Sequence, residues 1–168
     1  MTSLNPYLVR LATPEDAPAI ATVHVTSWRE TYAGIIPDSY LDRLDIAERQ
    51  QIWTKSIERG QPVHVAVVNE RVVGFANGGK NRDKDTAYAG ELYAIYLLKD
   101  FHKQGIGKKL FDSVIMHLKS QQLLPFTTWV LADNPTLSFY QHTGGKVIGE
   151  HFEEFDGCTL KELQLAWI

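Results

Sequence analysis

The sequence predicts one α/β (α+β) domain, residues 1–168, built on a central mixed sheet. The chain has 168 residues, of which 44% are hydrophobic and 22% charged, and this suffices for one full-sized core but leaves little for a second. Short β-branched runs alternate with segments of helical spacing, and no internal repeat, low-complexity tract or linker separates them. We therefore expect a sheet with helices packed on it.

The amino-terminal part predicts a strand and two helices. After a strand at residues 7–11, Thr13 supplies a cap hydroxyl and Pro14 suits the first turn of a helix that continues to about Trp28. Residues 32–38 break this helix, and apolar positions at helical spacing resume over residues 38–58. The two helices should meet at a kinked connection.

The rest of the chain predicts three strands and a helix, followed by a strand, a short helix and two final strands. Residues 63–68 and 72–76 are β-branched runs on either side of Asn69-Glu70, which indicates a hairpin, and residues 78–85 read as a polar loop. Residues 91–98 are apolar enough for a central strand, which leads through a glycine loop into a helix with a regular apolar face. A buried strand at 126–131, a short helix through Tyr140 that ends at Gly144-Gly145, and strands near 147–152 and 160–167 complete the order.

Charge and cysteine content narrow the partners and the compartment. A net charge of −3 argues against a nucleic-acid surface, and Cys158, the one cysteine, can form neither an intrachain disulfide nor a cysteine-based zinc cage. Residues 1–10 lack the order of a secretion signal and no apolar run approaches the ~20 residues of a membrane span, so we expect a cytoplasmic protein with no membrane partner. Edge strands at the carboxyl end could pair in a homodimer.

The glycine loop, residues 102–107, indicates phosphate binding. Gly105 and Gly107 allow a tight turn that presents backbone N–H groups at the positive end of the next helix. Such a Gly-x-Gly is also common in simple turns. A Walker loop and a dinucleotide fingerprint are both excluded, because the first needs Gly-Lys-Ser/Thr and the second needs a third glycine where Leu110 stands.

Residues 92–110 resemble motif A of the Gcn5-related N-acetyltransferases (GNAT), whose pattern is Gln or Arg, two residues, Gly, one residue, then Gly or Ala. Residues 134–140, Asn-Pro-Thr-Leu-Ser-Phe-Tyr, are similar to the family's second signature, and residues 28–38 resemble the helix junction of many bacterial members of uncharacterised substrate. The resemblance covers nearly the whole chain and implies the GNAT fold, a mixed, mostly antiparallel sheet with helices on both faces. It implies acetyl-coenzyme A as co-substrate, no metal, and direct transfer of the acetyl group to a primary amine of a small molecule, polyamine or peptide.

The same resemblance implies the site residues. The coenzyme would be held by the strand end, the loop and the second signature, namely Ile95, Tyr96, Leu97, His102, Lys103, Gln104, Gly105, Ile106, Gly107, Lys108, Asn134 and Tyr140. Tyr140 matches the general acid that protonates the departing thiolate, and Glu91 matches the glutamate base of histone-type members. A water chain, His24 or Glu30 remain alternative bases.

Two features leave alternatives open. His102 replaces the family's Gln or Arg, and since an ordinary imidazole loses its proton near pH ~6.5, we expect the affinity for coenzyme to vary with pH. Trp28, Tyr32, Ile36 and Tyr93 could line an acceptor pocket, although aromatic residues at such spacing also form cores.

The remaining histidines and the alternative functions complete the predictions. The spacing of metal ligands is missing from His64, His117, His142 and His151. An acetyl-coenzyme A-sensing module without acceptor chemistry, and transfer to oxygen or of longer acyl groups, are the alternative functions.

Overall fold

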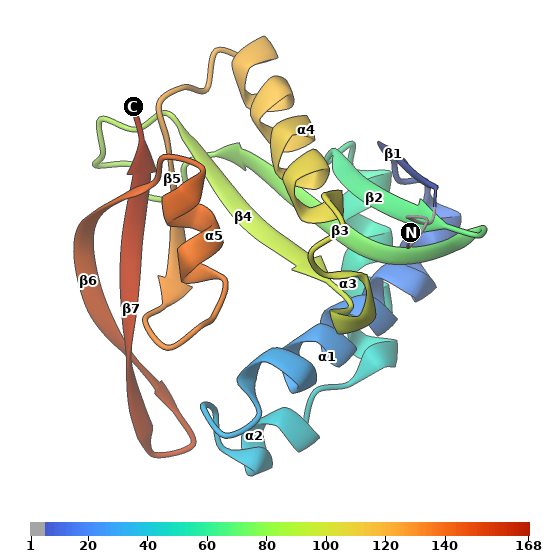
Figure 1. Ribbon diagram of the computed structural model, residues 1–168, viewed down its shortest axis with the longest axis horizontal. Helices are drawn as coiled ribbons and strands as arrows, with labels where there is room; N and C mark the ends of the chain where they lie inside the picture. Colours follow the sequence, from blue (N-terminus) through green and yellow to red (C-terminus); the bar gives the residue numbers. More distant parts are fainter. Residues whose placement is uncertain (1–5) are drawn as a thin grey trace.

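A computed structural model describes residues 6–168 of the chain. They form one seven-stranded sheet in the order β1-β2-β3-β4-β5-β7-β6, in which every neighbouring pair is antiparallel except β4 and β5 (Figure 1). The strands are β1 (Tyr7–Leu11), β2 (Val63–Val68), β3 (Arg71–Lys80), β4 (Gly90–Leu97), β5 (Phe126–Leu131), β6 (Lys146–Phe155) and β7 (Cys158–Trp167). The α-helices are α1 (Ala17–Tyr32), α2 (Asp38–Asp42), α3 (Ile46–Glu58), α4 (Ile106–Ser120) and α5 (Leu137–His142). The predicted mixed, mostly antiparallel sheet is confirmed.

Helices cover both faces of this sheet, and two neighbouring residues of β3 show how. A side chain at Gly74 would point at Leu110 of α4, whereas the ring of Phe75 packs edge-on against Trp53 of α3 at 5.0 Å between centroids. Successive side chains of a strand point to opposite faces, so α4 and α3 lie on opposite sides of β3. The fully buried Phe75 and Leu110 belong to the main hydrophobic core.

The predicted hairpin between β2 and β3 is confirmed. Asn69 and Glu70 have φ values of 48° and 63°, the positive angles that a two-residue type I′ turn requires. The continuous helix expected over residues 38–58 is wrong, because α2 ends at Asp42 and α3 starts anew at Ile46. Asp45 stands between them in an extended conformation and caps α3 by accepting a hydrogen bond from the N–H of Glu48 at 3.2 Å.

The predicted loop at residues 78–85 begins too early, because β3 continues to Lys80 and pairs there with β4. Gly78, Gly79 and Lys80 suggested a turn by composition. At Gly78, however, an added Cβ would lie 2.7 Å from the carbonyl oxygen of Glu91, so this glycine serves the close approach of two strands. The first helix also runs to Tyr32 and so extends beyond the expected end near Trp28.

β4 and β5 separate soon after they meet, and this positions the site. Their parallel pairing is limited to Gly90 with Phe126 and Glu91 with Thr127, although both strands continue. The ends of α1 and α2 lie below the gap between these strands in Figure 1. A second core cluster of Tyr32, Ile36, Leu41 and Leu131 joins those helices to β5.

In residues 6–168 no helix is both long and apolar enough to cross a membrane. Residues 1–5, which belong to the segment expected to lack a secretion signal, lie outside the described residues.

Candidate active site

A cleft of about 240 Å³ opens where β4 and β5 part. Residues 93–96 of β4 and 128–131 of β5 form its two sides, and residues of α1, α5 and β7 close it. Its walls are rich in aromatic side chains, among them Trp28, Tyr32, Tyr93, Tyr96 and Tyr140. Beyond Glu91 the edge of β4 that faces β5 has no strand partner, so its main-chain groups can bind a ligand in the cleft.

The glycine loop leads from the end of β4 into α4. Gly105 is the N-cap of α4 with φ 85°, and Lys103 also has a positive φ of 60°. Within residues 6–168, no backbone or side-chain acceptor receives the N–H groups of residues 103–108. Consecutive free N–H groups at the positive end of a helix form a binding site for an anion such as a pyrophosphate.

Side chains of this loop and of the first turn of α4 have partners inside the protein, among them Gln104, whose Nε2 donates to the carbonyl of Asp100 at 3.3 Å. His102 Nε2 lies 2.8 Å from the carbonyl oxygen of Leu97, and because a carbonyl only accepts, Nε2 carries the proton. His102 thus ties the loop to the end of β4. The ammonium group of Lys108 pairs with Asp112 at 2.7 Å, one turn further along α4.

Tyr140 reaches the cleft from α5. It is 6% exposed, its ring packs edge-on against Trp167, and burial raises its pKa, so that the phenol keeps its proton at neutral pH. Asn134 holds the turn before α5, since its Oδ1 accepts from the N–H of Thr136 at 2.8 Å and its Nδ2 donates to the hydroxyl of Tyr32 at 3.0 Å. Asn134 is therefore both a local cap and a tie between α5 and α1.

Glu91 is buried, but it is not among the residues that line the cleft. Its carboxylate accepts from the backbone N–H of Arg82 at 2.9 Å, from Nε at 3.2 Å and from Nη2 at 2.6 Å. These three hydrogen bonds to Arg82 occupy the oxygens that a base would use.

The residues expected to form an acceptor pocket are only partly brought together. Trp28, Tyr32 and Tyr93 line the cleft, whereas Ile36 is 1% exposed in the second core cluster. The hydroxyl of Tyr93 donates to the carbonyl of Lys80. Burial also raises the pKa of Tyr96 to about 12, and it raises the pKa values of Tyr32 and Tyr93. These three phenols therefore keep their protons at neutral pH.

Of the alternative bases, His24 lies in the core. Trp53 Nε1 donates to its Nδ1 at 3.2 Å, and burial lowers the pKa of His24 to about 4. Glu30 is exposed, where it accepts a hydrogen bond of 3.4 Å from the N–H of Lys99. Neither side chain lines the cleft.

Two charged residues of the cleft wall, Arg82 and Glu162, were not predicted. The sequence predicts a polar loop around Arg82 and indicates no site role for Glu162. Only the strand pairing brings Glu162 opposite His151, whose Nε2 lies 3.1 Å from its carboxylate. The sequence carries a weak signal, since Glu162 is a charged residue within a strand of alternating apolar residues.

Comparisons with known proteins agree with this geometry. The sequence profile of the acetyltransferase (GNAT) family matches residues 24–144. An uncharacterized N-acetyltransferase, YuaI of Bacillus subtilis, is 39% identical over 160 residues, which cover 95% of this chain and 91% of the relative. The crystal structure of a PaiA N-acetyltransferase from Thermoplasma acidophilum, solved with coenzyme A, is similar with a TM-score of 0.75 and 25% identity over 96% of this chain and 99% of that one. A ribosomal-protein-alanine N-acetyltransferase from Brucella melitensis has the same fold, with a TM-score of 0.77 and 23% identity over 96% and 99% of the two chains.

The parted strands, the glycine loop and the family match together define an acyltransferase, and the chain belongs to the GNAT family of acetyltransferases. It is an N-acetyltransferase, and acetyl-coenzyme A is the co-substrate typical of the family.

Proposed function

We propose that this N-acetyltransferase transfers the acetyl group of acetyl-coenzyme A directly to a primary amine in the cleft between β4 and β5. The observation that carries the proposal is that one strand, β4, connects the glycine loop with the cleft. β4 ends at Leu97, the His102 side chain ties the loop to that end, and the unpaired edge of β4 continues from there into the cleft. A pyrophosphate on the loop would therefore direct the rest of the coenzyme along β4.

The loop residues fit the coenzyme. The N–H groups of residues 103–108 supply donors for the pyrophosphate, and main-chain groups near Ile95, Tyr96 and Leu97 supply partners for the pantetheine arm. The coenzyme A in the Thermoplasma structure supports the same cofactor for this chain. Asn134 would contact the coenzyme through the side chain that holds the turn before α5.

The chemistry requires an acid and a base. As the amine nitrogen attacks the thioester carbon and the carbon–sulfur bond breaks, Tyr140 donates its phenolic proton to the departing thiolate. Burial keeps that proton on Tyr140 at neutral pH, which supports this role. An N–H group of β4 would stabilise the negative charge that develops on the carbonyl oxygen. Glu91, the base expected from the sequence, would first have to release Arg82.

The acceptor is a primary amine of a small molecule, a polyamine or a peptide. An aromatic cleft that also contains the carboxylate of Glu162 suits an amine that arrives as a cation. The indole N–H of Trp28 suits a direct role in binding, because it is buried in the wall of this cleft and makes no well-aligned hydrogen bond within residues 6–168, although the Tyr96 hydroxyl lies near it.

The test measures release of free coenzyme A thiol from acetyl-coenzyme A with a panel of small amines, polyamines and short peptides, and identifies the acetylated product by mass spectrometry. We expect release that depends on a free primary amine and is lost with the N-acetylated form of the same acceptor. Tight coenzyme binding without acceptor-dependent release across the panel would instead support a sensing module.

A further inference from the structure

The carboxylate of Glu162 lies in the wall of the cleft. It stands on β7 directly opposite Leu131 of β5 on one side and His151 of β6 on the other. Residues directly opposite in antiparallel strands share a face, so Glu162, His151 and Leu131 lie on one side of the sheet. Leu131 packs in the cluster with Tyr32, which places that side toward α1 and the acceptor end of the cleft.

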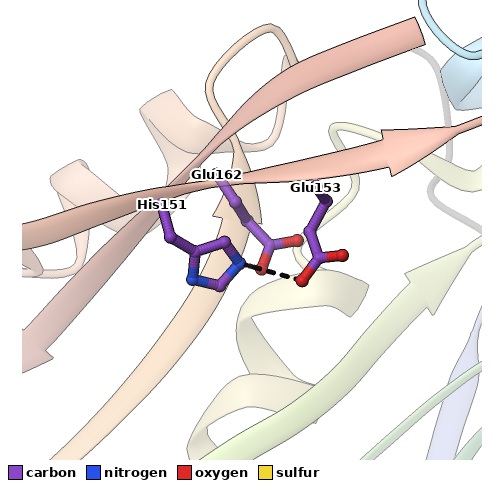
Figure 2. A group of neighbouring side chains, drawn as sticks. All are labelled: His151, Glu153 and Glu162. Carbon is purple, nitrogen blue, oxygen red and sulfur yellow. Dashed lines mark ion pairs between the residues drawn. The ribbon is translucent and has the colours of Figure 1, made fainter. Parts of the chain in front are cut away.

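His151, Glu153 and Glu162 converge on this face (Figure 2). His151 Nε2 lies 3.1 Å from an oxygen of Glu162 and 3.2 Å from an oxygen of Glu153. The side chain of Glu153 is 53% exposed and that of Glu162 only 21%. Glu162 is thus the inner carboxylate, which lines the cleft, and Glu153 is the outer one, which does not.

The charges that face Glu162 come from several elements. Burial raises the pKa of Glu162, and Glu153 raises it further, while His151 and Arg82 lower it, with a net upward shift. Its own negative charge raises the pKa of Tyr32 on α1 and of Tyr96 on β4. The field of Glu162 therefore reaches both the helix side and the strand side of the cleft.

Glu162 and Glu91 differ in what occupies their oxygens. Three donors of Arg82 hold Glu91, which lies outside the cleft lining. Within residues 6–168, Glu162 has only the ion pair with His151, whose Nε2 makes no well-aligned hydrogen bond. A carboxylate that is partly desolvated and held by a single neighbour can take up a proton from a ligand.

We infer that Glu162 is the general base that deprotonates the acceptor, with His151 as the residue that positions its carboxylate. The inference rests on the proposed function. A primary alkylamine enters as an ammonium ion, because such groups titrate near ~10.4. One N–H bond of the ammonium breaks, its electron pair stays on nitrogen for attack on the thioester, and an O–H bond forms on Glu162. After the attack a second N–H bond of the nitrogen breaks, and its proton replaces, through solvent, the one that Tyr140 gives to the departing thiolate. After product release Glu162 returns the first proton to water.

The test compares wild type with Glu162→Gln by the pH dependence of kcat/KM for an amine that the wild type accepts. We expect Glu162→Gln to lower kcat/KM at neutral pH by about 10²-fold or more and to lose the wild-type acid limb, which reports the protonation of Glu162. In its place the rate should climb about tenfold per pH unit up to the pKa of the amine near ~10.4, because the solvent then deprotonates the amine. Coenzyme binding by calorimetry should be unchanged.

Substitutions of the two neighbours of Glu162 should shift the acid limb in opposite directions along the pH axis. His151→Gln removes a group that lowers the pKa of Glu162 and should move the acid limb to higher pH, whereas Glu153→Gln removes a group that raises this pKa and should move the limb to lower pH. The matched control is Glu150→Gln, an exposed residue of β6 on the opposite face from His151, which pairs with Lys161 at 3.5 Å. It should leave the profile unchanged.

Three results would overturn the inference. Glu162→Gln with the rate and acid limb of an active wild type would show that another group is the base. Equal losses in Glu162→Gln and Glu153→Gln, together with inhibition of the wild type by a chelator, would show that the three side chains bind a metal ion, for which their ligand atoms lie within 4.8 Å of one another. A wild type that binds coenzyme but acetylates no amine would overturn the proposed function itself, and the inference with it.

Discussion

Gly105→Ala tests whether the loop conformation is what binds the coenzyme. Gly105 has φ 85°, and within residues 6–168 only the Tyr7 hydroxyl, at 3.7 Å, lies near the ideal position of an added Cβ, so the cost of alanine comes from the backbone. Left-handed backbone costs an L-residue about 1–2 kcal/mol. For a chain of this size that corresponds to a fall in Tm of about 2–8 °C.

Gly107→Ala is the matched control two residues later. Nothing lies within 4 Å of its added Cβ, its φ is not positive, and it stands in the first turn of α4. Alanine in a helix is favoured over glycine by about 0.5–1 kcal/mol, so this variant should melt about 1–4 °C above wild type. The family pattern also accepts Gly or Ala here, so coenzyme affinity should be retained.

Thermal unfolding with and without coenzyme A, together with calorimetry, measures both effects. A shift of the loop away from its left-handed turn that costs about 1.4 kcal/mol of binding energy raises the Kd of Gly105→Ala about tenfold. The stabilisation by saturating coenzyme should fall correspondingly. A Gly105→Ala protein that melts like the wild type and binds coenzyme equally well would refute the argument that this turn requires glycine.

The remaining predictions concern the acid, the buried ion pair and a core histidine. Tyr140→Phe should lower kcat about 10²-fold or more and leave coenzyme affinity unchanged. The control Tyr88→Phe should keep the wild-type kcat, and a fully active Tyr140→Phe would show that Tyr140 is not the general acid. Glu91→Gln should lower the free energy of unfolding in urea by about 1–3 kcal/mol, because it releases Arg82, but it should keep the acid limb of kcat/KM. Loss of that limb would show that Glu91 is the base. His24, with its pKa lowered to about 4, stays neutral in the fold while the unfolded chain takes up a proton below pH ~6.5. Stability should therefore fall from pH ~6.5 to ~4 by on the order of 2 kcal/mol, and His24→Gln should lose much of this slope; an identical slope in that variant would exclude His24 as its source.

Most of the fold could be predicted because its signals are local. The strand at Phe126–Leu131 and the hairpin at Asn69-Glu70 follow from β-branched runs and turn geometry, which depend on residues close in the chain. The errors occurred where a distant contact decided the outcome. Gly78 suggested a loop, but the backbone of β4 packs so closely on it that only glycine fits the strand.

The glycine loop shows what the sequence determined by itself. The spacing of Gly105 and Gly107 before an amphipathic helix predicts an anion site, which stays a prediction, and the structure confirms the left-handed turn at Gly105 before α4. The second signature around Asn134 and Tyr140 indicated the family, which the comparisons confirm. These signals are readable because a turn and a helix end depend on a few consecutive residues.

Only the tertiary structure decided which carboxylates face the acceptor cleft. Glu91 is directed to Arg82 by the pairing of β3 with β4, and Glu162 is set beside His151 by the register of β6 on β7. A shift of either register by one residue would turn these side chains to the other face of the sheet. Strand pairing depends on the packing of the whole core, and no short stretch of sequence contains that information.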